Sequence, residues 1–337
     1  MTESRARARR GVRPYAAGMK RLGMTIPLQI LPLAAHADWV RELEAIGFTD
    51  VWTSEAQDVD GFVPLALASQ WAPTLRLGCA CIPVQTRGPA TLAMGFSALC
   101  DTAPGRVVAG VGCSSEPIVR YWNALPFEKP YQRTRDTVRF LRAALGGEKV
   151  DAEYETFTVR GFRLRRKATP APPILVAALR AGMLELAGRE GDGVILNYVT
   201  PEDLPQVIPH VKKYGAEKEI AARIYVCPTR EAERVRHVAR MSIAAYFNVP
   251  TYRAHQEWLG KSALLAPMWD AWSRGDRRGA LEALPDSVVD SYYIHGPAEY
   301  CRERIEAYRE AGLDTPIIGL VEEAMDPREA ARLLAPS

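Results

Sequence analysis

A single carboxylate follows a short apolar run near the start of the chain. Glu55 comes directly after residues 50–54, a run that predicts a buried β-strand. In barrels of parallel strands and helices, active sites lie at the carboxyl ends of the strands, where a carboxylate can orient a substrate or exchange a proton. Glu55 is therefore the strongest catalytic candidate. A structural ion pair with a nearby arginine would explain the same residue without catalysis, and the sequence leaves both interpretations open.

Two later strand ends have residues suited to binding an anion. The run 106–111 leads into Gly112, Cys113, Ser114 and Ser115, and the run 173–178 ends in Ala177 and Ala178, followed by Leu179, Arg180 and Gly182. Both segments lead into a predicted helix, and glycines, hydroxyl groups and helix N-termini together bind phosphates. Taken alone, the first is equally a plain tight turn and the second a solvated arginine. Cys113 has no histidine near it in sequence, which favours a packed thiol over a nucleophile.

Small residues occupy the middle of a third apolar run, 75–84. Gly78, Cys79, Ala80 and Cys81 follow one another there, and small residues in a strand allow a flat ring to approach the backbone. This segment is the predicted contact for the ring of a cofactor.

Several other kinds of site are not expected. The six cysteines form no CxxC pair and the five histidines are scattered singly, so no metal site is predicted. The sequence has no GxSxG elbow, Walker loop or HExxH motif. Unpaired cysteines of this kind are typical of buried thiols in a reducing cytoplasm, which is the expected location.

Short β-rich runs alternate with helical patterns along nearly the whole chain. Eight strands are predicted, at residues 22–26, 50–54, 75–84, 106–111, 173–178, 193–198, 222–227 and 316–320. Eight strands that are each followed by helical sequence predict an α/β fold of the (β/α)8 TIM-barrel type. A doubly wound open sheet would give a similar alternation.

Two segments depart from this alternation of strands and helices. Residues 153–166 alternate polar and apolar side chains, with Gly161 before a return run, and predict an inserted hairpin. Residues 229–314 are too long for one helix and contain three tryptophans, which predicts extra helices over the barrel mouth before strand eight. No linker divides the chain, so residues 21–337 are expected to form one domain.

The charge is distributed unevenly. The formal net charge is +3, but seven of the Lys and Arg residues lie within residues 1–21 against one Glu, which leaves the rest of the chain mildly acidic. An acidic body predicts no nucleic-acid partner. No run is long and apolar enough for a membrane span, and residues 1–20 have no apolar segment typical of a secretory signal. These residues are interpreted as a disordered basic leader.

Several motifs, taken in order, resemble the luciferase-like flavin and deazaflavin oxidoreductase superfamily. They are residues 47–55, 75–78 with 87–90, 104–112, 173–178 and 187–193, so the resemblance covers about residues 20–325. The branch that is most similar is the actinobacterial group that uses coenzyme F420, a deazaflavin.

The resemblance implies a cofactor site and a reaction. A deazaflavin ring would lie against strands two to four, over a non-proline cis peptide at Ala80–Cys81, with Glu55 beside its reactive part. Its phosphate-bearing tail would contact residues 113–115 and 178–182. The sugar-phosphate dehydrogenases of this group have a histidine where this chain has Ala56, and Gly-Glu where it has Ser114–Ser115. These departures argue against sugar-phosphate oxidation and favour a reductase or an enzyme for another substrate.

The sequence is consistent with three functions. Hydride transfer between coenzyme F420 and a small molecule comes first, because the cofactor supplies the chemistry and the protein the orientation. A flavin mononucleotide (FMN) monooxygenase is the nearest alternative, since both cofactors need a ring site and a phosphate site. A non-catalytic flavin-binding protein is the third. Many relatives are homodimers, and a homodimer is expected here.

Overall fold

Eight parallel strands close into a barrel in the computed structural model, which describes residues 20–57 and 59–336. The barrel order is β1–β2–β3–β5–β8–β9–β10–β12, and β12 pairs with β1 to close the ring. The strands are β1 Gly23–Thr25, β2 Asp50–Thr53, β3 Arg76–Cys79, β5 Val107–Gly112, β8 Ile174–Ala177, β9 Gly193–Asn197, β10 Glu219–Cys227 and β12 Thr315–Leu320. The predicted TIM barrel is confirmed, because a doubly wound sheet would leave two open edges.

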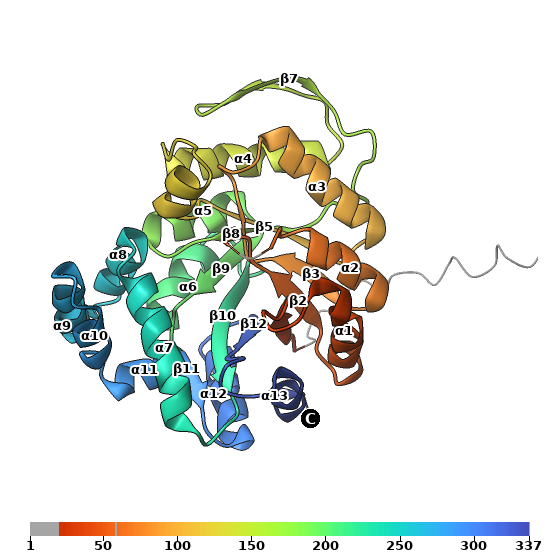
Figure 1. Ribbon diagram of the computed structural model, residues 1–337. Coiled ribbons are helices and arrows are strands. Elements are labelled where there is room, and N and C mark those ends of the chain that lie inside the picture. Colours follow the sequence, from red (N-terminus) through yellow and green to blue (C-terminus); the bar gives the residue numbers. More distant parts are fainter. Residues whose placement is uncertain (1–19, 58, 337) are drawn as a thin grey trace, which may run out of the picture.

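Helices surround the barrel between successive strands (Figure 1). Most of their apolar faces pack into the largest buried cluster, as Trp39, Val40 and Leu43 of the first helix do. Gly47 and Gly312 follow two of these helices with φ of 98° and 102°, a conformation that residues with a side chain adopt at a cost. The helices of this ring are α1 His36–Ala45, α2 Val63–Trp71, α3 Pro89–Thr102, α4 Pro130–Leu145, α5 Ala181–Glu190, α6 Leu204–Lys212 and α12 Ala298–Glu310, and α13 Pro327–Leu334 packs beside α12.

The predicted third strand is interrupted. It was expected to run from 75 to 84, but β3 ends at Cys79 and a short strand, β4 Ile82–Pro83, pairs separately with β5. The cis peptide bond expected at Ala80–Cys81 lies at this break. The Ala80 amide donates to Thr53 O and the Glu55 amide to Cys81 O, so the break is tied to the end of β2.

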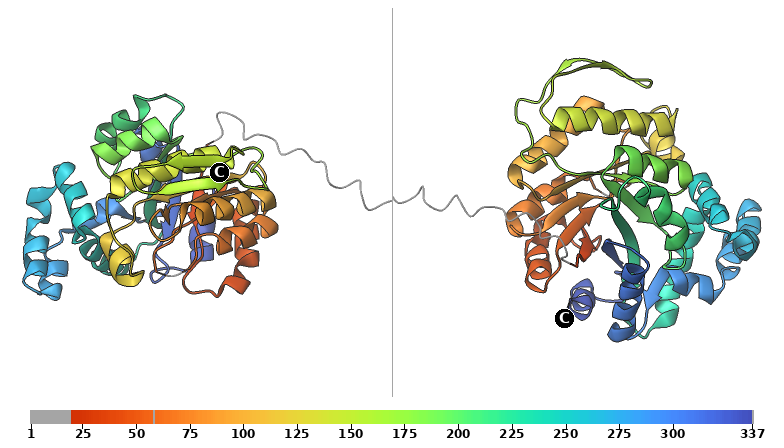
Figure 2. Two further views of the ribbon diagram at one scale, coloured as in Figure 1. Left: turned by 90° about the horizontal axis from the view of Figure 1, so that it is seen from above. Right: turned by 180° about the vertical axis from the view of Figure 1, so that it is seen from behind.

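The inserted hairpin is present, with its turn in a different place. Strands β6 Val150–Glu153 and β7 Thr158–Phe162 pair antiparallel, and the turn lies at residues 154–157 rather than at Gly161. Phe140 of α4 explains the difference, because Tyr154 and Phe157 pack against its ring at 6.5 and 6.2 Å. Figure 2 shows the hairpin lying outside the barrel, across α4.

The segment between β10 and β12 adds five helices beside one part of the barrel. They are α7 Ala232–Phe247, α8 Pro250–Trp258, α9 Ser262–Ser273, α10 Arg277–Glu282 and α11 Asp286–Tyr292, followed by strand β11 Tyr293–His295, which pairs with β10. They enclose a second hydrophobic core that includes Tyr198 and Tyr225. The added helices were expected over the barrel mouth. Helices α9 and α10 lie at the periphery of the molecule instead (Figure 1), and α8 fits the expectation better.

Buried charges join four strands at the amino end of the barrel. Arg76 of β3 forms ion pairs with Asp50 of β2 and, at 2.6 Å, with Glu219 of β10. Thr315 of β12 donates to Glu219 at 2.6 Å. Burial alone would raise the pKa of Glu219, but Arg76 outweighs it and holds that pKa below its ordinary value. Above this network, the Trp52 ring lies 5.4 Å from the Arg76 guanidinium.

Replacing Arg76 should unfold the barrel easily. Arg76→Met removes the shared counter-charge of the buried Asp50 and the half-buried Glu219, and among the described residues leaves Asp50 only Arg21, at 3.6 Å. Removing one partner of a buried ion pair typically costs about 3–5 kcal/mol. Urea unfolding measures this loss. Arg41→Met is the matched control, because the Arg41–Asp38 pair is exposed and should contribute less than about 1 kcal/mol. Equal small losses in both variants would show that the buried network does not hold the strands together.

The same ion-pair network predicts that the free energy of unfolding decreases in acid. Because the folded-state pKa of Glu219 is lowered, its contribution to stability is complete above its ordinary pKa of 4.5 and is lost as the pH falls through the lowered value. Arg76→Met should flatten this part of the stability curve.

Candidate functional site

The interior of the barrel changes character towards the carboxyl ends of the strands. An inner core from six strands fills the lower layer: Trp52, Val108, Leu175, Ile195, Ala221 and Ile317. Side chains two residues apart on a strand face the same way, so the next inward positions are Gly110, Ala177, Asn197, Arg223 and Gly319. Ala177, Asn197 and Arg223 are half-buried, whereas the residues below them are almost fully buried. Solvent therefore reaches the barrel interior from the carboxyl end.

Glu55 lies beyond β2 and is paired with an arginine. Arg87 Nη2 donates to Glu55 Oε2 at 2.6 Å and also contacts Asp60. The Gly61 amide donates to the same Glu55 oxygen at 3.0 Å, whereas Oε1 has a single longer contact, to Arg87 Nε at 3.3 Å. The Glu55 hydrogen bond raises the pKa of Arg87 despite partial burial. The ion-pair interpretation is thus observed, and Oε1 retains capacity to accept a further hydrogen bond.

Three predicted cofactor residues from neighbouring strands meet at one point. A Cβ on Gly112 would lie 2.7 Å from Cys81 Sγ and 2.8 Å from the Ala177 Cβ, so only glycine fits there. Ser114 follows with φ of 59°, in a sharp turn towards the π-helical segment Pro117–Trp122. Burial raises the pKa of the Cys113 thiol, although Arg180 opposes the shift. A thiol that stays protonated is a poor nucleophile, so Cys113 is better suited to contact than to attack.

The end of β8 presents an uncapped helix N-terminus. Helix α5 begins at Ala181, after Arg180, with no side chain capping its first turn and no acidic residue in that turn. A Cβ on Gly182 would have nothing within 4 Å. There is therefore open space beside Gly182, and uncapped backbone N–H groups with a favourable helix dipole suit a phosphate. Ala178 is buried, and Leu179 is half-buried.

Sequence reasoning missed three polar residues of the barrel mouth. Asn197 and Arg223 lie within apolar runs, where they were interpreted only as parts of strands, and Tyr252 lies in the added segment. Asn197 Nδ2 donates to the Tyr252 hydroxyl at 3.0 Å, which links β9 to α8. An arginine at an inward position of an otherwise apolar barrel strand is the signal that was available.

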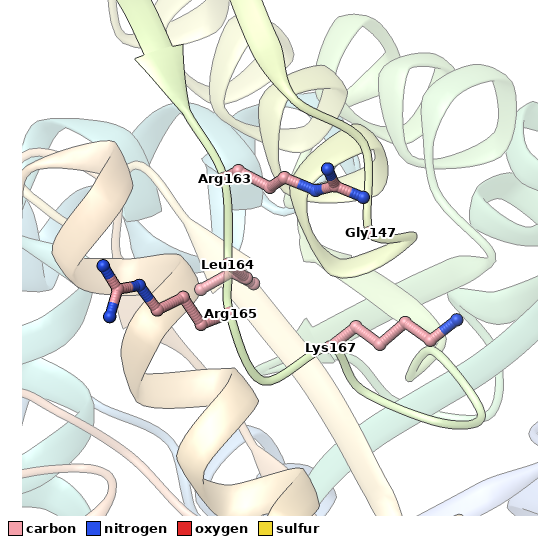
Figure 3. Close-up of a pocket in the computed structure, with 5 residues that line it drawn as sticks. All are labelled: Gly147, Arg163, Leu164, Arg165 and Lys167. Carbon is pink, nitrogen blue, oxygen red and sulfur yellow. The ribbon is translucent and has the colours of Figure 1, made fainter.

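A basic hollow lies elsewhere on the surface. It has a volume of about 570 Å³ and is lined by Gly147, Arg163, Leu164, Arg165 and Lys167. These residues come from the turn after α4 and the connection leading into the amino end of β8, far from the strand ends described above. The Arg163 and Arg165 side chains point in opposite directions (Figure 3), so they do not converge on one ligand.

Two further kinds of site are absent from the part of the chain that the structure describes. No group of three or more His, Cys, Asp or Glu side chains there is arranged to hold a metal ion. No helix among residues 20–57 and 59–336 is long and apolar enough to cross a membrane.

Comparison with known proteins places the chain in a family. The profile of the luciferase-like monooxygenase family matches residues 7–315. The chain belongs to this family. The superfamily predicted from the sequence motifs is therefore confirmed, and with it the assignment as an oxidoreductase enzyme.

The proteins to which the chain is similar differ in the cofactor that their names give. The chain is 26% identical over 299 residues to the 5,10-methylenetetrahydromethanopterin reductase of Methanolobus tindarius, covering 86% of this chain and 90% of that protein. The coenzyme F420-dependent tetrahydromethanopterin reductase of Methanopyrus kandleri has the same fold, with a TM-score of 0.79 at 18% identity over 94% and 97% of the two chains. An F420-dependent secondary alcohol dehydrogenase superposes with a TM-score of 0.75 at 18% identity over 94% and 99%. An FMN complex of a Baeyer–Villiger monooxygenase from Pseudomonas putida gives 0.65 at 14% identity over 94% and 97%.

Proposed function

We propose that this enzyme transfers a hydride between coenzyme F420 and a small organic substrate, acting as a reductase. The observation that carries the proposal is the arrangement of two sites on neighbouring strands. The small half-buried side chains of Ala80, Cys81 and Ala177, of which the last two pack over Gly112, suit a flat ring. The uncapped start of α5 near Gly182 suits a phosphate. When bound, the deazaflavin supplies the hydride chemistry. The names of the relatives favour F420 over FMN.

The protein's own residues would bind and orient this cofactor. Ala80 and Cys81 would contact the ring, and Gly112 with Cys113 would allow its close approach to β5. Ser114 and Ser115 would donate hydroxyl hydrogen bonds to the tail. The backbone from Ala177 through Ala178, Leu179, Arg180 and Gly182 would hold the phosphate, with Arg180 adding positive charge.

Cofactor titration tests the proposal. Quenching of deazaflavin fluorescence should report tight, saturable binding of coenzyme F420, and FMN should bind more weakly. Anaerobic mixing of the reduced complex with carbonyl or enone acceptors should then oxidise the deazaflavin. Tight FMN binding without F420 binding would favour a monooxygenase. F420 binding without turnover of any acceptor would favour a non-catalytic binding protein.

Glu55 is proposed as the catalytic-site carboxylate. Its Oε1 atom has only the long Arg87 contact among the described residues, which leaves it able to hydrogen-bond the cofactor or relay a proton. Glu55→Gln keeps the size of the side chain and removes the charge. We expect cofactor affinity to change little and turnover to fall about 10²–10⁴-fold, the usual contribution of a positioned acid or base.

Asp60→Asn is the matched control for Glu55→Gln. Asp60 contacts the same Arg87 guanidinium but is more exposed, at 39% against 16% for Glu55. If Glu55 only balanced the charge of Arg87, the two variants would have similar turnover. If Glu55→Gln lowers the melting temperature and keeps its turnover, Glu55 is only the structural partner of Arg87.

Two expectations from the sequence stay predictions. The homodimer would be tested by sedimentation equilibrium, where a monomer mass independent of concentration would contradict it. A reducing cytoplasmic location fits the free state of all six cysteines, and localisation of a tagged chain would test it.

A further inference from the structure

An arginine points into the mouth of the barrel. Arg223 is two residues beyond Ala221 on β10, and Ala221 belongs to the inner core of the barrel. The two side chains therefore face the same way, with Arg223 one layer nearer the carboxyl end. Its side chain is half-buried, so that solvent touches part of it, and its Nε atom is fully buried. A Cβ on Gly319 would lie 3.2 Å from that Nε, so the glycine on β12 makes room for the arginine.

Arg223 has no counter-charge. Within residues 20–57 and 59–336 no carboxylate forms a salt bridge with it, and its Nε has no hydrogen-bond partner. Its guanidinium carbon lies 5.2 Å from the centre of the Tyr225 ring. Arg76, at the opposite end of the same barrel, differs from Arg223 because it has two carboxylate partners. An enclosed guanidinium without an anion is costly, and a ligand that brings one would repay that cost.

The neighbouring side chains add a second donor. Asn197 lies opposite Arg223 in the β9–β10 register and donates to the Tyr252 hydroxyl. Because that hydroxyl oxygen is already an acceptor, its own proton is available to a ligand. Burial raises the pKa of Tyr252, with further contributions from Tyr246 and other neighbours, so the phenol stays protonated at physiological pH. Asn197 thus has Arg223 opposite it on β10 and contacts the Tyr252 phenol of α8, and a guanidinium with a phenol suits an oxyanion.

The position of Arg223 points to the substrate rather than the cofactor. In the closed order of eight strands, β10 is four strands from β3 in either direction, so Arg223 faces Ala80 across the barrel. The start of α5, the proposed phosphate site, follows β8, two strands from β10. The proposed phosphate site and the Arg223 site are thus separate.

We propose that Arg223 and Tyr252 bind an anionic group of the substrate, a carboxylate or a phosphate, across the barrel mouth from the cofactor ring. The identity of that ring rests on the function proposed above. The enzyme would then act on an organic acid or a phosphate ester and hold its charged end against β10, which leaves the reducible part of the molecule over the ring.

Anion binding to matched variants tests the proposal. Isothermal titration of inorganic phosphate, of acetate, and of chloride as the ionic-strength control is carried out on the cofactor-free and the F420-loaded protein. Wild type should bind phosphate or acetate saturably, and the anion that binds identifies the chemical class. Arg223→Met should weaken that binding about 10–100-fold, the usual value of hydrogen bonds to a charged group. Arg278→Met removes the same charge from an exposed side chain and should change nothing.

The outcomes separate this proposal from the proposed function. Unchanged anion affinity in Arg223→Met, or no saturable binding of either anion to wild type, would overturn the Arg223 site. A loss of F420 affinity in Arg223→Met with unchanged anion binding would assign Arg223 to the cofactor and also overturn it. If F420 does not bind at all, the proposed function fails, and the cofactor-free titrations still decide the role of Arg223. If Arg223→Met does not fold, Arg223→Lys replaces it in the test. This variant keeps the charge but loses the planar guanidinium, and it is expected to weaken anion binding.

Discussion

The buried ion-pair network of Arg76, Asp50 and Glu219 closes the amino end of the barrel, and the rest of the molecule depends on that closure. The network joins β2, β3 and β10, and the Trp52 ring packs directly above it. Glycines at 23 and 78 make this packing possible, because a Cβ at either position would collide with the indole. With one end closed by charges and an aromatic ring, the inner side chains meet solvent only at the other end. The inner side chains that solvent reaches therefore lie at the carboxyl ends of the strands.

The open end divides into two unlike halves. On the side of β3, β5 and β8, the half-buried residues Ala80, Cys81 and Ala177 are small, and α5 begins with no side-chain cap. On the side of β9 and β10, Asn197 and Arg223 project polar groups, and α8 adds Tyr252. The first half is suited to a planar cofactor with a phosphate, and the second to a charged substrate. The added helices matter because their second core holds the tyrosines of that second half in place.

Much of this architecture could be predicted from local patterns. Buried parallel strands are apolar throughout, so the eight runs were visible, and the glycines at 47 and 312 marked helix ends because of their positive φ. The candidate residues after β2, β5 and β8 could be predicted, because barrel topology alone brings the carboxyl ends of the strands together. What could not be predicted depends on distant contacts. Arg87 lies 32 positions from Glu55, and the hairpin turn is set by packing against Phe140. Arg223 was missed because whether an inward arginine has a carboxylate partner is a property of neighbouring strands, which sequence order does not reveal.

The central claim is that one end of this barrel holds a deazaflavin between the small-residue surface and the polar wall of β9 and β10. A crystal structure of the protein with oxidised coenzyme F420 tests it most directly. We expect electron density for the ring against Ala80, Gly112 and Ala177. The phosphate should lie at the start of α5 near Gly182, with Arg223 on the far side of the ring. Density for the ring outside the barrel mouth, or for the phosphate beside Arg223, would contradict it.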